Sequence, residues 1–307
     1  MRLLVTGAAG FVGSHVVRAA LGRGHEVVAA VRSRARAAAL EDCTGVRLVE
    51  ADLADARAMR QMALDVSPDL ALHLAWSIGP DYCDSPDNLP CVEGSLALLH
   101  GLVDAGCARV VFVGSHLELA PSDRDMDEND SVAPRDLYAV CKDAVHRIAR
   151  AYVAGTQTSF VWARLFNLYG PVQADWALVP HVVRHLLDGR QCPMTHGEQR
   201  RGFLHARDAA DALLDVGQAS VRGVVHVGSD DVVSVRELAQ RIGERLGRAE
   251  LLAFGALPPS PRDAPRIVSS TVRLRSEVGF HPRVCLDDGL QDTIDWWRTR
   301  DRSLGAA

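Results

Sequence analysis

Several features that would point to other classes of protein are missing from this chain of 307 residues. No run of about 18 or more apolar residues is present, so a membrane-spanning helix is not expected. The seven cysteines are odd in number and include no Cys-x-x-Cys pair, which argues against a disulfide framework and against a structural zinc site. No internal repeat and no low-complexity linker interrupts the sequence.

A large excess of positive charge is also missing. The formal net charge is -5 at pH 7, which gives no electrostatic reason to expect nucleic acid as the main partner. The N-terminus passes directly from Met1-Arg2 into an apolar run, without the charged region and cleavage site of a secretory leader. We therefore expect a cytoplasmic protein with reduced thiols that binds neither membranes nor nucleic acid.

The first distinctive motif is a glycine-rich turn near the N-terminus. Gly7, Gly10 and Gly13 follow the apolar run Leu3-Leu4-Val5 and precede an amphipathic segment. This spacing is typical of a strand, a tight turn and a helix N-terminus that holds a pyrophosphate, because the first N–H groups of a helix attract anions. A dinucleotide is the expected ligand, although similar turns occur in other strand-to-helix connections.

Tyr138 and Lys142 form the second motif. Their spacing places both side chains on one face of a helix, with Cβ atoms roughly 5 to 6 Å apart. An ammonium at that distance would lower the pKa of the phenol and make it a usable acid or base near neutral pH. Such pairs are also common on solvated helices, so this one gains its meaning from the glycine-rich turn and from the α/β pattern around both motifs.

Strand-like apolar runs alternate with helical patterns through the first half of the chain. Short connections between them indicate a parallel sheet covered by helices on both faces, a doubly wound, Rossmann-like α/β fold. The predicted strands span residues 3–6, 26–31, 46–50, 70–74, 110–114, 160–164 and 223–227. The predicted helices span residues 12–23, 56–64, 92–106, 137–154, 179–189, 207–219, 234–246 and 286–298. A loop with a solvated acidic cluster at 123–130 is expected over residues 120–135.

After Gly170-Pro171 the alternation becomes irregular and prolines accumulate. We expect a dinucleotide-binding domain over residues 1–170 and a smaller mixed α/β lobe over residues 171–307, with segments such as 203–227 able to return to the first domain. Ligands of open α/β sheets bind at the carboxyl ends of the strands. The second lobe would therefore cover the cofactor crevice and select the substrate.

With both motifs in place, the chain resembles the extended short-chain dehydrogenase/reductase family, in particular its nucleotide-sugar epimerase, dehydratase and reductase members. Ser115 after the fifth predicted strand is similar to the family's catalytic serine or threonine, and His73-Leu74-Ala75 is similar to its fourth-strand motif. The segments 164–171 and 201–205 also resemble family motifs. The likeness spans nearly the whole chain and implies an oxidoreductase that acts on a nucleotide-diphosphate sugar as a homodimer.

The resemblance implies a role for each candidate residue. Tyr138 would exchange a proton with the oxygen on the reacting sugar carbon, Ser115 would orient that oxygen, and Lys142 would hold the nicotinamide ribose. The candidate substrate contacts are Ser115, His116, Tyr138, Asn167, Arg201 and Arg262. The last three are candidates for the diphosphate, because a guanidinium matches two phosphate oxygens. For His116, satisfaction by the backbone is an equal alternative. The candidate cofactor contacts are Gly7, Gly10, Phe11, Val12, Gly13, Arg32, Ser33, Arg34, Asp52, Leu53, Leu74, Ala75, Trp76, Tyr138 and Lys142.

The end of the second predicted strand bears on the choice of cofactor. NAD enzymes of this fold place an Asp there to bind the ribose hydroxyls, whereas this chain has Val31 followed by Arg32, Ser33 and Arg34. Arginines beside a small hydroxyl suit a 2′-phosphate, so NADP(H) is favoured. NAD(H) stays open, since the same residues could form a basic loop exposed to water.

The residues after Ser115 bear on the reaction. Family members that remove water from a sugar place Asp-Glu there, whereas this chain has His116 and Leu117, so 4,6-dehydration is not expected. Reduction of a dTDP- or CDP-linked 4-keto-6-deoxyhexose by NADPH is favoured, as in deoxysugar biosynthesis. An epimerase that retains NAD is the alternative, and a non-catalytic NADP-binding sensor is the third.

His181 and His185 superficially suggest a pair of metal ligands, because residues four apart share a helix face. No Glu follows His181, and the sequence identifies no third ligand. We therefore interpret the pair as part of a helix surface and expect no metal site.

Overall fold

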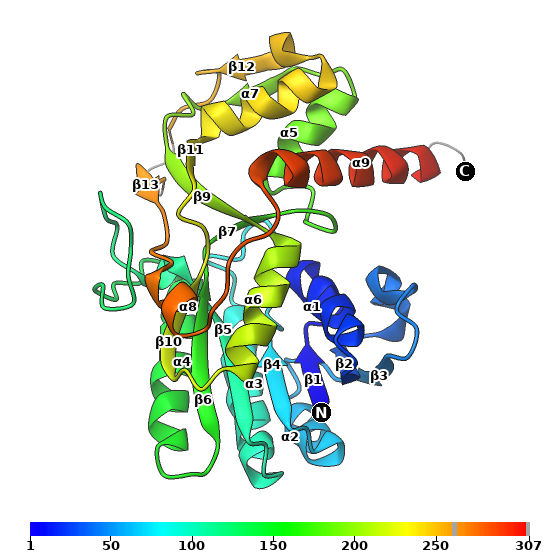
Figure 1. The fold of residues 1–307 in the computed structure, drawn as a ribbon, viewed down its shortest axis with the longest axis vertical. Coiled ribbons are helices and arrows are strands. Elements are labelled where there is room, and N and C mark those ends of the chain that lie inside the picture. Colours follow the sequence, from blue (N-terminus) through cyan, green and yellow to red (C-terminus); the bar gives the residue numbers. More distant parts are fainter. Residues whose placement is uncertain (260–262, 305–307) are drawn as a thin grey trace.

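The computed structural model describes residues 1–259 and 263–304. Its main feature is a seven-stranded parallel sheet with the strand order β10-β6-β5-β4-β1-β2-β3 (Figure 1). The strands are β1 (Arg2–Thr6), β2 (Glu26–Val31), β3 (Arg47–Glu50), β4 (Leu70–His73), β5 (Arg109–Ser115), β6 (Ser159–Leu165) and β10 (Gly223–Val227). The predicted doubly wound fold is confirmed. The direction of strand order reverses between β1 and β4, and ligands of such sheets bind outside the carboxyl ends of the strands at that point.

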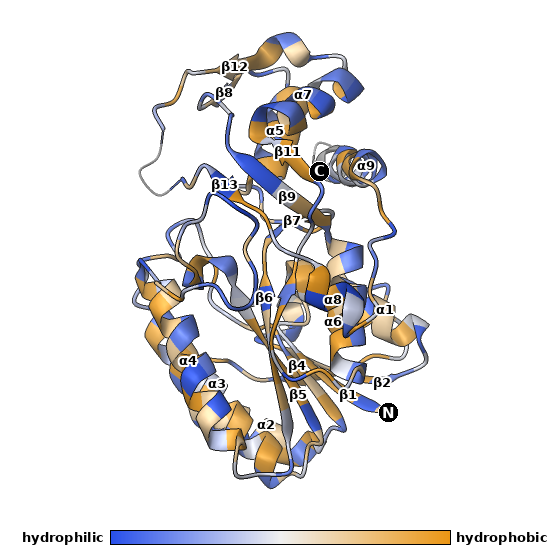
Figure 2. Cartoon of the chain, turned by 60° about the vertical axis from the view of Figure 1, so that its left-hand side comes forward, coloured by the Kyte–Doolittle hydropathy of each residue, from blue (hydrophilic) through white to orange (hydrophobic). Residues whose placement is uncertain are grey.

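Helices cover both faces of this sheet. One face packs against α1 (Phe11–Gly22) and α6 (Ala206–Gln218), and the other against α2 (Ala56–Val66), α3 (Asn88–Asp104) and α4 (Leu137–Val153). Successive side chains of a strand point to opposite faces, so Leu3 and Val5 join the α1–α6 core whereas Leu4 joins the α2–α3–α4 core. Burial on both faces explains why the central strands are continuous apolar runs (Figure 2).

A smaller lobe lies beyond the carboxyl ends of the main strands (Figure 1). Its helices α5 (Leu178–Leu187), α7 (Val235–Leu246) and α9 (Leu286–Leu304) share an apolar core, and α8 (Val272–Ser276) is a short helix that lies against β10. Strand β9 (Arg200–His205) pairs with β7 (Asn167–Tyr169), β11 (Val232–Ser234) and β13 (Arg266–Ile267), and β8 (Cys192–Met194) pairs with β12 (Leu252–Phe254). Short 3-10 turns lie at 34–36, 38–40, 116–118 and 249–251.

Two elements that follow residue 171 belong to the main sheet. β10 pairs with β6 in parallel, and α6 packs on α1. The main unit therefore contains 206–218 and 223–227 in addition to its N-terminal part, whereas the division at residue 170 stays a prediction. Within the two described ranges, no helix has both the length and the apolar character that crossing a bilayer requires.

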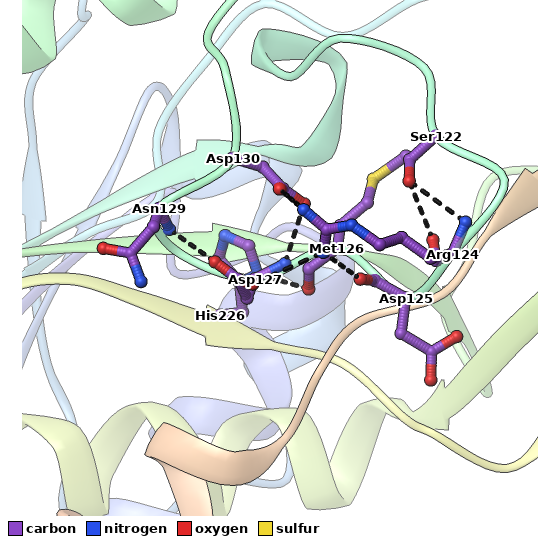
Figure 3. Close-up of polar contacts among 8 residues, drawn as sticks. All are labelled: Ser122, Arg124, Asp125, Met126, Asp127, Asn129, Asp130 and His226. Carbon is purple, nitrogen blue, oxygen red and sulfur yellow. Dashed lines mark hydrogen bonds and ion pairs between the residues drawn. The ribbon is translucent and has the colours of Figure 1, made fainter.

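The acidic loop between β5 and α4 forms a cluster of polar contacts among its own side chains and backbone (Figure 3). Arg124 forms ion pairs with Asp127 and Asp130, and the Asp130 side chain is only 13% exposed. Met126 is buried, and its backbone oxygen lies 3.3 Å from Nδ1 of His226. The predicted solvated cluster is therefore wrong for Asp130, because an arginine within the loop neutralises the carboxylates while Met126 anchors the loop to the core.

Candidate active site

The glycine-rich turn joins β1 to α1 at the point where the strand order reverses. Gly7 has φ +66°, and a Cβ atom there would lie 2.7 Å from the backbone nitrogen of Ala75. A Cβ on Gly13 would lie 2.1 Å from the Gly7 oxygen, and no side chain caps α1 at Gly10. The turn is thus a cradle that larger residues would fill, next to a helix N-terminus that attracts anions. These properties fit the pyrophosphate of a dinucleotide.

The three predicted catalytic residues come together beside this turn. Ser115 ends β5, while Tyr138 and Lys142 lie in the first turns of α4, which begins after the capping residue Asp136. Tyr138 is only 8% exposed, and its side chain forms a hydrogen bond with that of Ser115. This contact places the phenol and the serine hydroxyl close enough together to reach the same carbonyl oxygen.

Lys142 is buried next to the phenol and is the only lysine in the chain. Its Nζ donates a hydrogen bond of 2.8 Å to the Val113 carbonyl and lies 3.8 Å from the ring centroid of Trp76. The same Nζ lies 5.8 Å from the ring centroid of Tyr138. That the chain has a single lysine, at this position, was a signal in the sequence that the motifs alone did not use.

Burial shifts the pKa of both side chains. It raises the pKa of Tyr138 above 10, and it lowers the pKa of Lys142 from 10.5 to about 7, against the opposing effect of Glu118. The net shift of the phenol pKa is therefore opposite to the lowering expected from the ammonium, because burial penalises the charged phenolate. Tyr138 keeps its proton at neutral pH and is suited to donate it.

Glu118 is a residue of the site that motif reasoning missed. Its carboxylate is fully buried and accepts hydrogen bonds from the Ser115 N–H at 2.7 Å, from Trp162 Nε1 at 2.9 Å and from Arg164 Nε at 2.8 Å. Ser115 and Glu118 form a capping box, a spacing that is visible in the sequence. Because three donors hold it, Glu118 fixes the backbone of Ser115 and is not positioned to transfer protons itself.

His116 lies half-buried beside this network. Burial lowers the pKa of His116 to about 4, although a hydrogen bond to the Leu165 backbone acts in the opposite direction. Its ring lies 5.6 Å from that of Phe166. The imidazole is therefore neutral at pH 7 and has the backbone partner that the alternative requires, while its contact with the substrate stays a prediction.

The other predicted substrate contacts lie in the smaller lobe. Asn167 on β7 donates to the Ile267 carbonyl at 3.2 Å, and Arg201 on β9 is buried and forms an ion pair with Asp263. Nothing in the sequence pointed to Asp263 as this partner. Arg262 lies outside the described residues, so its predicted role stays a prediction.

The predicted cofactor contacts at the ends of β2, β3 and β4 flank the glycine-rich turn. Arg32 is exposed, and its guanidinium has no hydrogen-bond or ion-pair partner among the described residues. Arg34 donates from its backbone N–H to Glu50 at 2.7 Å and from Nη2 to the Leu48 carbonyl at 2.9 Å. After β4, the Ala75 N–H donates to Thr6 Oγ1 at 3.3 Å, which holds that segment against the end of β1. The remaining candidates are Ser33, half-buried, Asp52, exposed, Leu53, buried, and Leu74 and Trp76, half-buried.

Comparison with known proteins identifies the family. The profile of the NAD dependent epimerase/dehydratase family matches residues 3–228. The chain belongs to this family. It is 30% identical to the dTDP-glucose 4,6-dehydratase of Streptomyces niveus, over 97% of this chain and 93% of that protein. It is 28% identical to the dTDP-4-dehydro-6-deoxy-D-allose reductase of Streptomyces bikiniensis, over 98% of this chain and 97% of that protein.

Solved structures of the family agree with this assignment. The Thermus thermophilus UDP-glucose 4-epimerase in complex with NAD superimposes with a TM-score of 0.86 at 26% identity, covering 97% of this chain and 99% of that chain. The expected resemblance to nucleotide-sugar members of the extended short-chain dehydrogenase/reductases is confirmed. For a member of the NAD dependent epimerase/dehydratase family, the cradle at Gly7–Gly13 and the trio of Ser115, Tyr138 and Lys142 are the parts that would hold a nicotinamide dinucleotide and act beside it.

Proposed function

We propose that this protein is an NADPH-dependent ketoreductase of a nucleotide-diphosphate 4-keto-6-deoxyhexose carried on dTDP or CDP. The observation that carries the proposal is the composition of the site around Ser115. A proton-donating phenol and an orienting hydroxyl are present, whereas the positions after Ser115 hold a neutral imidazole and a leucine instead of an acid and a base. The relative that reduces a dTDP-linked 4-keto sugar adds support.

The mechanism assigns each residue of the trio one task. A bound nicotinamide supplies the hydride. Tyr138 donates its phenolic proton to the carbonyl oxygen of the sugar, and the Ser115 hydroxyl donates a hydrogen bond to the same oxygen and fixes its direction. Lys142 would hold the ribose of a bound cofactor and, when protonated, would stabilise the phenolate that remains until a solvent proton restores the phenol.

Glu118 supports reduction over elimination. Removal of water from a sugar needs a group that takes a proton from carbon and a group that protonates the leaving hydroxyl. Glu118 is the first carboxylate after Ser115 in the sequence, but it is fully buried and accepts from three donors. Its carboxylate forms an ion pair with Arg164, so it cannot take up or donate a proton in the reaction without breaking that pair.

Arg32 supports the choice of NADPH. Its exposed guanidinium at the end of β2 has the charge and the forked geometry that a 2′-phosphate needs. Replacing Arg32 by Ala should lower kcat/KM for NADPH by about 10- to 150-fold and change kcat/KM for NADH little, since one charge-assisted contact contributes about 1.5 to 3 kcal/mol. Arg57→Ala, an exposed position on α2, is the matched control. An unchanged ratio of the two kcat/KM values in Arg32→Ala would contradict the assignment.

The proposed activity is tested directly with dTDP-4-keto-6-deoxyglucose. We expect stoichiometric loss of NADPH absorbance and a product whose C4 configuration can be assigned by NMR. No oxidation of either NADPH or NADH with dTDP- and CDP-linked 4-keto sugars would overturn the proposal.

One observation favours an epimerase as the second candidate. The Glu50 carboxylate lies at the same end of the sheet as Arg34, whose guanidinium is already bound to the Leu48 carbonyl. A carboxylate there suits ribose hydroxyls better than a phosphate, and the Thermus epimerase was solved with NAD. Cofactor that survives purification, together with 4-epimerisation of a UDP- or dTDP-hexose and no net loss of NADPH, would establish this alternative.

A further inference from the structure

The smaller lobe brings a third potential metal ligand to the histidine pair on α5. His181 and His185 lie one helical turn apart, with ring centroids 4.1 Å from each other, and Cys192 begins β8 after the helix ends. One nitrogen from each histidine and Sγ of Cys192 all lie within 4.8 Å of one another. The sequence identified no third ligand, because Cys192 comes close to the pair only where the chain turns back after α5 and places a buried thiol near the two histidines.

We propose that His181, His185 and Cys192 bind a zinc ion and leave its fourth coordination position open to solvent. Zinc binds well to thiolate sulfur and imidazole nitrogen, whereas magnesium and calcium prefer oxygen donors. Ligand atoms around tetrahedral zinc lie about 3.3 to 3.6 Å apart, so the three side chains need to close by roughly 1 Å.

The histidines are prepared to act as ligands. Nδ1 of His185 lies 2.8 Å from the His181 carbonyl, and donation of its proton to that oxygen leaves Nε2 with a lone pair for the metal. Cys192 binds as the thiolate, so formation of the Zn–S bond releases the thiol proton to solvent.

The surroundings can accept a divalent cation. A cavity of about 210 Å³ borders the two histidines and is lined by Asp175, Trp176, Arg184 and Arg190. Both arginines are neutralised, since Arg184 pairs with Asp175 and Arg190 pairs with Asp188, each at 2.7 Å. The cavity gives water access to the open position.

The site lies close to the aromatic residues that border the catalytic phenol. The Trp176 ring, which lines the cavity, lies 6.1 Å from the ring of Tyr82, and Tyr82 lies 4.8 Å from the ring of Tyr138. A metal that joins α5 to β8 would therefore stiffen the part of the lobe that lies next to Tyr82 and the catalytic phenol. This role does not depend on which reaction the trio catalyses.

The test uses full-length protein without an affinity tag, stripped of metal with a chelator and titrated with Co²⁺. We expect a thiolate-to-cobalt charge-transfer band that saturates at one equivalent and disappears when Zn²⁺ is added. Cys192→Ala should lose the band, and the double variant His181→Asn/His185→Asn should lose at least about tenfold in Co²⁺ affinity. Cys107→Ala is the matched control, because Cys107 is also buried and burial raises the pKa of both thiols to about 11.

Three results would overturn the proposal. They are the absence of the band in the unmodified chain, its persistence in Cys192→Ala, and its equal loss in Cys107→Ala. Cobalt binding without a thiolate band would show a surface histidine pair only. If Cys192→Ala does not fold, the double histidine variant decides, because its side chains are half-exposed and an unchanged Co²⁺ affinity there rejects the site.

Discussion

Burial acts at this site on an acid and on a base at once. It raises the pKa of Tyr138, so the phenol keeps its proton, and it lowers the pKa of Lys142, so the ammonium loses its proton more readily. A reductase benefits from the first effect, because a neutral phenol is the proton source for the developing alkoxide. The second effect makes the charge of Lys142 sensitive to what binds beside it, since an anionic cofactor would favour the ammonium.

Replacing Tyr138 by Phe should remove the proton donor with little change to the surrounding packing. We expect kcat for ketone reduction to fall by about 10² to 10⁴-fold, the usual contribution of general acid catalysis. The dissociation constant for NADPH should stay within about threefold of the unmodified value, a change below 1 kcal/mol. Steady-state kinetics and fluorescence titration measure the two quantities. Retention of most of the activity would reject Tyr138 as the donor.

The single lysine allows a direct measurement of its pKa. Selective isotope labelling of lysine gives one side-chain NMR signal, and in the cofactor-free protein we expect it to titrate near pH 7, as burial predicts. Because the folded pKa lies below the unfolded value of 10.5, the unfolded chain binds more protons in between, and stability from this group is lost as the pH falls from about 10 to about 7.

Lys142→Met should remove this pH dependence. As the pH falls from about 10 to about 7, the free energy of unfolding of the variant should therefore rise relative to that of the unmodified chain. This difference should change by at most about 1.4 kcal/mol per pH unit and should stay constant below pH 7. Urea denaturation at a series of pH values measures it. A difference that does not change with pH would mean that Lys142 titrates normally in the folded protein.

At the scale of the element, the turn between β1 and α1 makes a sharp comparison possible within one helix. Gly13→Ala places a Cβ 2.1 Å from the Gly7 oxygen, whereas a Cβ at Gly22 meets no atom within 4 Å. Gly13→Ala should destabilise the protein by about 1 to 3 kcal/mol through overpacking and weaken NADPH binding by at least about tenfold, because the cradle must shift. Gly22→Ala, the control, should be neutral or stabilising by up to about 1 kcal/mol. Equal effects of the two substitutions in urea unfolding and cofactor titration would refute the cradle.

The elements that the sequence predicted correctly are those with a local signal. The strands of the main sheet are apolar runs, and α4 begins after Asp136 and ends at Val153, within one residue of the prediction. The short strands β7, β11 and β13 were missed, because each has two or three residues and exists only through its pairing with β9. A ladder between distant segments leaves no periodic pattern in either one.

The same distinction applies to the side chains of the site. Ser115, Tyr138 and Lys142 stand in recognisable motifs, and the structure brings them together. The Arg201–Asp263 pair and the hold of Trp162 and Arg164 on Glu118 link residues that are at least 44 positions apart. Such contacts depend on how β6, β9 and the 3-10 turn at 116–118 pack, which propensity and spacing do not encode.

At the scale of the whole molecule, the fold divides the work between two units. The main sheet carries the cradle and the trio, and the smaller lobe contains Asn167 and Arg201, the predicted substrate contacts. After β9 in the smaller lobe, the chain returns to the main unit as α6 and β10 and then goes back to the lobe at β11. It therefore crosses between the units more than once. These crossings restrict the movement of the lobe relative to the main sheet, as the proposed reduction of a ketone from one face requires.

The outer face of α4 leads to a prediction about assembly. Val140, Ile148 and Tyr152 are 47%, 48% and 41% exposed and, at multiples of four residues, lie along one stripe of the helix. The His100 ring on α3 lies 5.8 Å from that of Tyr152, which extends the stripe onto the neighbouring helix. Because an isologous contact requires one self-complementary patch, two antiparallel copies of this helix pair can bury the stripe across a two-fold axis.

We therefore expect a homodimer whose stability depends on this stripe. Ile148→Glu should raise the dimer dissociation constant by at least about 10²-fold, since two charges per dimer would be buried without partners. Val272→Glu is the control, because Val272 on α8 is 72% exposed and lies outside the stripe. Sedimentation velocity over a range of concentrations measures both variants. A monomer at all concentrations, or a dimer that both substitutions leave intact, would place any assembly on another face, and α4 would then serve only to carry Tyr138 and Lys142 to the crevice.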